Sequence, residues 1–284
     1  MAPTPPLPEY TAEFQFLKLS YPSPGVMHVE LNRYWREFEA AFSRISLDST
    51  VRAIVLSSAL PKLFCGGVDL SFLQSLNHNT DAGRSGLLIR QMTTEFQHAV
   101  SAPERCPYPV IAATHGKVIG LGVDILAACD IRWTAEDAVF SIKEAAVGLA
   151  ADVGSLARLP KIVGNSSLLF ELALTARDFS AQEAKDLGLV SNIVEGGRDE
   201  VVGAALGLAS RIAQLSPLAA LGTKRFLLHA REHSTQSTLE YEATWNMGVL
   251  QGPDMVQTAT AAIQKKGKVD YAPLAPWLKP ITKL

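Results

Sequence analysis

Three carboxylate residues in one stretch of mostly small and apolar residues, 119–154, are the strongest candidates for chemistry. Asp124, Glu144 and Asp152 follow one another at intervals of 20 and 8 residues. Acids in apolar surroundings have perturbed pKa values, and such groups transfer protons in active sites. A structural alternative makes Asp124 an ordinary polar residue of a helix and Asp152 an N-cap, because carboxylates are common at helix starts. All three acids beside a glycine turn favour catalysis.

Two glycine-rich turns, Cys65-Gly66-Gly67 and Gly120-Leu121-Gly122, each join a predicted strand to a predicted helix. Glycine lets the backbone approach a ligand closely, and the first turn of a helix has free N–H groups. We expect the N–H groups of Gly66 and Leu121 to form an oxyanion hole, which stabilises negative charge on a carbonyl oxygen. For the first turn taken alone, an ordinary strand-to-helix connection is the alternative.

Neither turn carries an activated nucleophile. Cys65 has no basic partner nearby in the sequence and is interpreted as structural. His115 stands at a strand end before a glycine, and we interpret it as a hydrogen-bonded structural residue. The chemistry that remains is proton transfer next to a carbonyl, with the enolate held by backbone donors.

Strands alternate with helices through the first half of the chain, which predicts an α/β fold with a largely parallel sheet. Ligands in such folds bind where strand ends meet helix starts, and both glycine turns occupy such positions. The last third is helical and differs in character, as expected of a packing or assembly module. Residues 77–85 are polar and predict a loop. The predicted strands are 14–19, 26–31, 53–56, 63–65, 110–114, 131–133 and 139–142, and the predicted helices are 34–45, 87–100, 123–129, 155–163, 166–175, 181–187, 201–215, 217–229, 239–250 and 255–264.

Composition excludes several classes of function. A net charge of −2 gives no electrostatic basis for binding nucleic acid or an anionic membrane. The longest apolar runs, such as 201–209, are too short for membrane insertion. The three cysteines have no metal-binding spacing, so we expect no metal site, and their odd number indicates reduced thiols in an intracellular compartment.

The segments FCGGVDL (64–70) and PVIAATHGKVIGLGVDILAACDIRW (109–133), with the helical tail, resemble the crotonase (enoyl-CoA hydratase/isomerase) superfamily. Within it, KEAAVGLAADVGSLARLPKIVGN (143–165) is especially similar to the Δ3,5-Δ2,4-dienoyl-CoA isomerases. The resemblance implies an α/β crotonase fold, a spiral of ββα units with a C-terminal helical region that builds a homotrimer or a hexamer. It divides the chain into a proline-rich leader (1–12), a spiral core with the acyl-CoA site (13–210) and a trimerisation region (211–284).

The same resemblance implies a fatty acyl-CoA substrate and no cofactor, because coenzyme A is part of the substrate. Its thioester oxygen would lie between the N–H groups of Gly66 and Leu121. The substrate-binding positions carried over by the motifs are Gly66, Gly67, Val68, Asp69, Leu70, Gly120 and Leu121.

The pattern Asp, Glu, Asp is that of the dienoyl-CoA isomerases of fatty-acid β-oxidation, whereas hydratases have glutamates at the positions of Asp124 and Glu144 and no acid at 152. The resemblance implies that Asp152 removes a proton from C2, Glu144 delivers one at C6, and Asp124 supports Glu144. Deprotonation at C2 spreads charge as far as C6, so two separate acids suit the reaction. An apolar lining over residues 147–151 would exclude water and favour isomerisation over hydration.

One departure from the family concerns the sequence after Leu31-Asn32-Arg33, where a Pro-x-x-x-x-Asn-Ala type segment that shapes the CoA site is missing. Two alternatives to the dienoyl-CoA isomerase remain open. One is an enoyl-CoA hydratase or Δ3,Δ2-enoyl-CoA isomerase that uses mainly Glu144. The other is a non-catalytic crotonase-fold oligomer, motivated by the shortened segment.

The C-terminal residues Thr282-Lys283-Leu284 approximate the Ser-Lys-Leu peroxisomal address. They predict a peroxisomal location and recognition by the peroxisomal import receptor. A cytosolic or mitochondrial location is the alternative, although the first 12 residues lack the amphipathic Arg/Ser pattern of a mitochondrial presequence.

Overall fold

The computed structural model describes residues 14, 16–31, 35–69, 81–265, 267 and 269–274. Four sequence-based predictions fall outside these residues. They concern the leader (1–12), the junction at Asn32-Arg33, the substrate contact of Leu70, and the C-terminal tripeptide.

A six-stranded sheet forms one side of the fold, with the strand order β1-β2-β3-β5-β7-β10. The first two strands make an antiparallel hairpin that turns at Gly25, where φ is +78°. Every other neighbouring pair in this sheet is parallel, as the alternation of strands and helices predicts. Its strands are β1 (Leu17–Ser23), β2 (Val26–Leu31), β3 (Ala53–Ser58), β5 (Val110–Thr114), β7 (Ile131–Ala135) and β10 (Asn192–Val194).

A second sheet has four short strands in the order β4-β6-β8-β9. Its strands are β4 (Leu63–Cys65), β6 (Lys117–Ile119), β8 (Val139–Ser141) and β9 (Phe179–Ser180). Three of them directly follow strands of the larger sheet in the chain, so β3-β4, β5-β6 and β7-β8 each cross from one sheet to the other. Repetition of this step, with helices between, gives the successive turns of the fold.

Both faces of the six-stranded sheet are buried, which explains why the first four residues of β3, 53–56, are all apolar. Alternate residues point to opposite faces: Val55 belongs to the cluster under α10 (Arg198–Ala213), and Ile54 belongs to the main core. The main core also receives Phe38 and Phe42 of α2 (Trp35–Ile45), whose rings lie 4.8 Å apart. Packing on both faces of the sheet fixes the positions of the strand ends.

Near the strand ends the sequence predicts most of the helices, but not α5 (Ala102–Arg105) or the 3₁₀ turn η1 (Glu144–Val147), and it places the start of α6 (Leu121–Ala127) two residues late and that of α4 (Ala82–Val100) five residues late. The polar stretch 77–85 predicts a loop, but residues 82–85 are helical because the Asp81 carboxylate accepts the N–H groups of Gly83 and Arg84 at 2.9 and 3.1 Å. The remaining segments here are α7 (Ser155–Ile162), α8 (Ser166–Thr175) and α9 (Ala181–Leu187).

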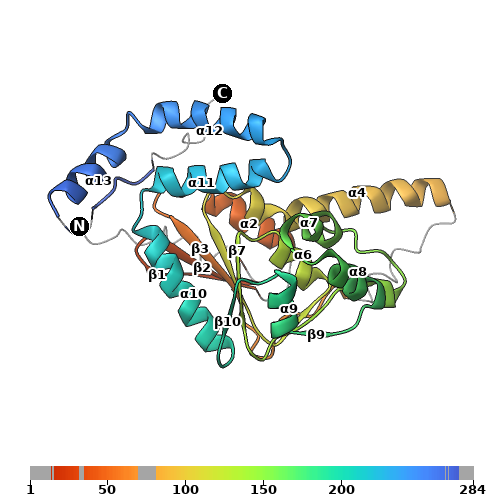
Figure 1. Ribbon diagram of the computed structural model, residues 1–284. Helices are drawn as coiled ribbons and strands as arrows, with labels where there is room; N and C mark the ends of the chain where they lie inside the picture. The colour runs from red at the N-terminus through yellow and green to blue at the C-terminus, as the bar shows by residue number, and fades with distance from the viewer. Residues whose placement is uncertain are drawn as a thin grey trace.

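Three C-terminal helices follow: α11 (Pro217–Ala230), α12 (Thr235–Val249) and α13 (Pro253–Ile263). Helix α11 lies against the body of the molecule, α12 runs beside α11 on its outer side, and α13 extends to the edge (Figure 1). Within the described residues no single helix is long and apolar enough to cross a membrane. Taken together, α10 and α11 have the length and composition of a membrane span, but the pair is bent by 111°.

Candidate active site

One cavity of about 360 Å³ brings together the three predicted acids and both glycine turns. Asp124 reaches it from α6, Glu144 from the start of η1, and Asp152 from the loop before α7. Gly66 and Leu121 are on its wall. The sequence separates these groups by up to 86 positions, and the crossing between the two sheets brings them to one place.

Asp124 is almost completely buried, with 1% of its surface exposed. Its Oδ1 accepts the backbone N–H of Ser155 at 2.6 Å and thereby caps the start of α7. Burial raises the pKa of Asp124 above its ordinary value, and the Ser155 hydrogen bond opposes that rise. Asp124 is therefore a cap as well as a member of the acid cluster, and it connects α6 to the loop that carries Asp152.

Glu144 is held against Gly120, where a side chain could not fit. A Cβ on Gly120 would lie 2.9 Å from Glu144 Oε1, and Gly120 has φ of +50°. Glu144 Oε2 is buried and has no hydrogen-bond partner among the described residues. Burial raises the pKa of Glu144, and the charges of Asp124 and Asp152 raise it further. Such a carboxyl group favours its protonated form and is suited to donate a proton.

Asp152 differs from the other two acids because its side chain is exposed. It lines the cavity, but it lies beside solvent rather than in the apolar surroundings that the sequence predicts. The alternative role as N-cap of α7 is not observed, since Gly154 occupies the cap position and Asp124 accepts the Ser155 N–H. Of the predicted apolar lining, only Val147 and Leu149 contact the cavity.

The two proposed oxyanion donors lie next to each other on the wall because α6 packs closely against the end of β4. A Cβ on Gly122 would come within 3.0 Å of Cys65 Cβ and 3.2 Å of Cys65 O, so only glycine permits this approach. Neither the Gly66 N–H nor the Leu121 N–H, which belongs to the first residue of α6, donates a hydrogen bond to another described residue. Two free donors thus border one cavity.

Cys65 precedes the first donor but is not a nucleophile. Burial raises the pKa of its thiol to about 11, so the thiol stays protonated at neutral pH. The Nε2–H of His115 donates to the Leu60 carbonyl at 2.8 Å; His115 is fully buried and does not line the acid cavity. Both residues have the structural roles that the sequence predicts.

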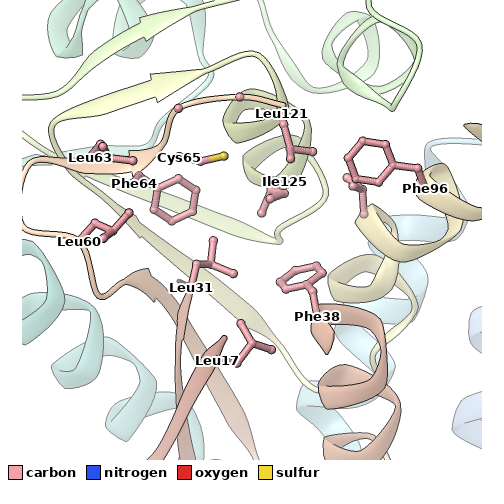
Figure 2. Close-up of a pocket in the computed structure, with 13 residues that line it drawn as sticks. Leu17, Leu31, Phe38, Leu60, Leu63, Phe64, Cys65, Phe96, Leu121 and Ile125 are labelled. Carbon is pink, nitrogen blue, oxygen red and sulfur yellow. The ribbon is translucent and has the colours of Figure 1, made fainter. Parts of the chain in front are cut away.

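A second, apolar cavity of about 180 Å³ adjoins the first (Figure 2). Leu17, Leu31 and Phe38 form one side of it, and Leu60, Leu63 and Phe64 form another. The two cavities share Gly66, Gly67, Phe96 and Leu121. The two oxyanion donors therefore lie at the junction, with the acids on one side and an apolar space on the other.

The wall of the acid cavity contains some of the predicted substrate-contact residues and several residues that the sequence did not indicate. Val68 and Gly120 line the acid cavity, whereas Asp69 is not part of its wall. The sequence missed the contribution of α4, whose residues Ile89, Met92, Thr93 and Phe96 form one side. Their spacing of three to four residues marks one helical face, which was the available signal. No group of three or more metal-ligating side chains occurs among the described residues.

A site that combines carboxyl groups with backbone N–H donors suits an enzyme that transfers protons next to a carbonyl group, and comparison with known proteins gives the family. The profile described as enoyl-CoA hydratase/isomerase matches residues 31–271. The chain belongs to this family, and its fold is the α/β crotonase fold with C-terminal helices.

Individual relatives are more specific. The chain is 42% identical over 266 residues to the mitochondrial Δ(3,5)-Δ(2,4)-dienoyl-CoA isomerase of Mus musculus, covering 89% of this chain and 81% of the relative. It is 43% identical over 256 residues to the peroxisomal Δ(3,5)-Δ(2,4)-dienoyl-CoA isomerase of Arabidopsis thaliana, covering 85% and 91%. Among solved structures, an enoyl-CoA hydratase from Bacillus anthracis superposes with a TM-score of 0.80 at 27% identity, over 90% of this chain and 98% of that one.

Proposed function

We propose that this protein is a Δ3,5-Δ2,4-dienoyl-CoA isomerase, which converts a 3,5-dienoyl-CoA to a 2,4-dienoyl-CoA in fatty-acid oxidation. The observation that carries the proposal is one cavity in which three acids meet two backbone N–H groups that have no partner among the described residues. The dienoyl-CoA isomerases among its relatives, 42–43% identical over most of their length, support the same reaction. Coenzyme A is part of the substrate, and the reaction needs no cofactor.

In the proposed mechanism Asp152 is the base. Asp152 lines the cavity with an exposed side chain, and as the proposed base it accepts the C2 proton from the substrate. The Gly66 and Leu121 N–H groups donate to the thioester oxygen, where charge accumulates as C2 loses its proton. The charge spreads along the conjugated chain to C6.

Glu144 is the proposed acid. Burial and two neighbouring carboxylates favour its protonated form, and protonation of C6 converts the dienolate to the 2,4-diene. Asp124 does not need to contact the substrate: its buried carboxyl group disfavours ionisation of Glu144 and fixes the start of α7. Each acid thus has the role that its surroundings suit.

The test is an ultraviolet assay of the purified protein with 3,5-octadienoyl-CoA beside Asp152→Asn. We expect conversion by the wild type and a loss of about 10²- to 10⁴-fold in the variant, the usual contribution of a general base. Absence of conversion by wild-type protein that still binds the substrate would contradict the proposal. If the protein adds water to a 2-enoyl-CoA faster than it isomerises 3,5-octadienoyl-CoA, its activity is that of a hydratase.

We also propose that residues 211–284 form the contacts of a homotrimer, either alone or paired into a hexamer. The C-terminal helices expose large apolar side chains that a monomer would leave in water, including Met247 (68% exposed) and Ile263 (83% exposed). The occupant that we infer for these faces is a second copy of the same chain, because the exposed residues continue over α11, α12 and α13: Leu227, Leu239, Met247, Leu250, Met255, Val256 and Ile263.

We propose a peroxisomal location, with recognition of Thr282-Lys283-Leu284 by the import receptor. The relative from Arabidopsis thaliana is peroxisomal, and the relative from Mus musculus is mitochondrial. Fluorescence microscopy of the full chain, with a fluorescent protein at its N-terminus and with or without Leu284, tests this proposal. Unchanged peroxisomal fluorescence after deletion of Leu284 would exclude the tripeptide as the signal.

A further inference from the structure

The segment Ala151–Gly154 is a thin wall between two cavities. Asp152 and Val153 line the acid cavity on one side and a surface cavity of about 600 Å³ on the other. Residues 151–153 belong to no helix or strand, so regular secondary structure does not fix the proposed base. Side-chain contacts from α4 and α7 hold the segment instead.

The first contact comes from Gln97 on α4. Its side-chain Nε2 donates to the backbone carbonyl of Asp152 at 2.6 Å, across 55 positions of sequence. Gln97 is exposed and does not line the acid cavity. Its hydrogen bond therefore acts on the backbone of the base without touching the substrate.

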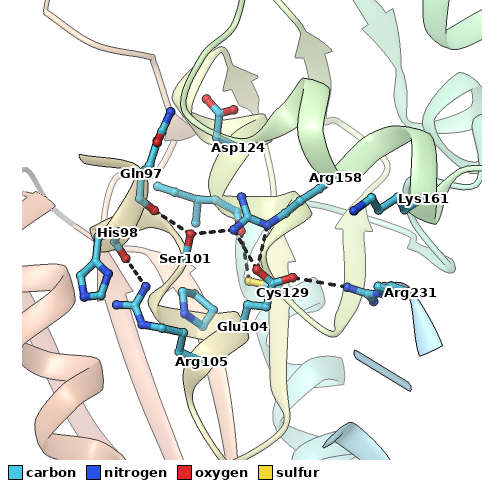
Figure 3. Close-up of polar contacts among 12 residues, drawn as sticks. Gln97, His98, Ser101, Glu104, Arg105, Asp124, Cys129, Arg158, Lys161 and Arg231 are labelled. Carbon is cyan, nitrogen blue, oxygen red and sulfur yellow. Dashed lines mark hydrogen bonds and ion pairs between the residues drawn. The ribbon is translucent and has the colours of Figure 1, made fainter. Parts of the chain in front are cut away.

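The second contact comes from Arg158 on α7. Its Nε and Nη2 donate to Glu104 Oε2 at 3.0 and 2.8 Å, and Nη2 also donates to Ser101 Oγ at 2.6 Å (Figure 3). The guanidinium group packs on Gly154, where any side chain would collide with it. Arg158 thus fixes the far end of the wall.

The two contacts form one network. The hydroxyl group of Ser101, which accepts from Arg158, donates to the backbone carbonyl of Gln97 at 2.6 Å (Figure 3). The Arg158–Glu104 pair is largely shielded from solvent, with side chains 15% and 29% exposed. Shielded charge-assisted hydrogen bonds keep their geometry better than exposed ones, which favours a rigid anchor.

We propose that Gln97 and Arg158 are positioning residues that clamp the Ala151–Gly154 segment and so hold the Asp152 carboxylate at the distance from C2 that proton removal requires. The inference rests on the proposed role of Asp152 as the base. A displacement of about 1 Å can cost about 100-fold in rate, so a clamp that does not touch the substrate still controls turnover.

The variant that tests the clamp is Gln97→Met, which keeps the length of the side chain and removes the donor. We expect kcat to fall about 10- to 100-fold while KM changes less than about 2-fold, because the oxyanion donors and the cavity walls remain. Gln97→Lys restores an N–H donor and should recover most of kcat. Gln91→Met is the matched control: Gln91 is exposed on the same helix, its side chain bonds to Glu95 and to no other described side chain, and it lines none of the three cavities.

A second measurement tests whether Gln97 holds the segment in place, independently of catalysis. Hydrogen–deuterium exchange of peptides spanning residues 149–156 should be faster in Gln97→Met than in wild type, and unchanged in Gln91→Met. Unaltered kcat and unaltered exchange in Gln97→Met would overturn the inference. A wild-type protein without isomerase activity would overturn the proposed function, while faster exchange in Gln97→Met would still establish the clamp.

Discussion

At the scale of single residues, the acid cluster combines groups with opposite exposure. Asp124 and Glu144 are withdrawn from water, and burial raises the pKa of both, whereas Asp152 meets solvent. Different surroundings, rather than different residue types, allow carboxyl groups in one site to take the roles of acid and base. The same burial has a cost in stability that can be measured.

Glu144→Gln should make this cost visible. The folded-state pKa of Glu144 is raised, so the wild type loses stability as pH rises through the ordinary glutamate pKa of about 4.3 and up to the raised value. Urea unfolding at pH 7 should therefore show the Glu144→Gln variant at least as stable as wild type, and the advantage should vanish below about pH 4. An advantage that grows toward acid pH would contradict the assigned shift.

The kcat of the wild type should also decrease as pH rises, as its stability does. Glu144 donates only when protonated, so kcat should fall as pH rises through its raised pKa, and this alkaline limb should be absent from the residual activity of Glu144→Gln. Rate measurements with 3,5-octadienoyl-CoA across the range from about pH 5 to about pH 9 test this. A limb that persists in the variant would belong to another group.

At the scale of elements, a buried ion pair joins the first of the C-terminal helices to the body of the molecule. Lys224 on α11, with its side chain 4% exposed, lies 2.7 Å from Asp130 and also donates to the carbonyls of Pro103 and Tyr108 at 2.7 and 2.9 Å. Asp130 in turn accepts the N–H of Val110 at the start of β5. One side chain thus connects α11 to the central sheet.

Lys224→Met should destabilise the fold by about 3–5 kcal/mol at pH 7, because it leaves the Asp130 carboxylate buried without its partner. Without the lysine the already raised pKa of Asp130 rises further, so the loss should shrink as pH falls and Asp130 becomes protonated. Chemical unfolding at pH 7 and at about pH 5 measures both effects. Lys161→Met, which removes an exposed pair with Glu232, is the control and should change stability little.

The sequence predicted helices and strands accurately where neighbouring residues mark their ends. Strand 110–114 and helices 166–175 and 181–187 were predicted to the residue, since apolar runs, N-caps and flanking glycines mark their ends. The start of α4 was wrong because its cap, Asp81, stands in a polar stretch that resembles a loop. Long-range contacts have no local signature: the Asp124 cap of Ser155 and the Gln97 bond to Asp152 span 31 and 55 positions.

At the scale of the whole molecule, the C-terminal helices expose apolar surface, in keeping with the proposed trimer. Met247→Glu with Ile263→Glu should shift the protein to a smaller assembly, because charged side chains in an apolar contact cannot be solvated or paired. Size-exclusion chromatography with light scattering measures the change. A wild type that is already monomeric would contradict the assembly proposal, and Lys185→Glu, an exposed position on α9 outside residues 211–284, is the charge control.

The exposure of Asp152 predicts how hydrogen isotopes are distributed in the product. If Asp152 is the base, as proposed, its contact with water lets the captured proton exchange with the bulk, and the proposed acid Glu144 must take a new proton from outside the substrate before the next turnover. The hydrogen that leaves C2 is then not the one that arrives at C6. Product formed in heavy water should carry deuterium at C6 from the first turnover, and intramolecular transfer of a C2 label should be negligible.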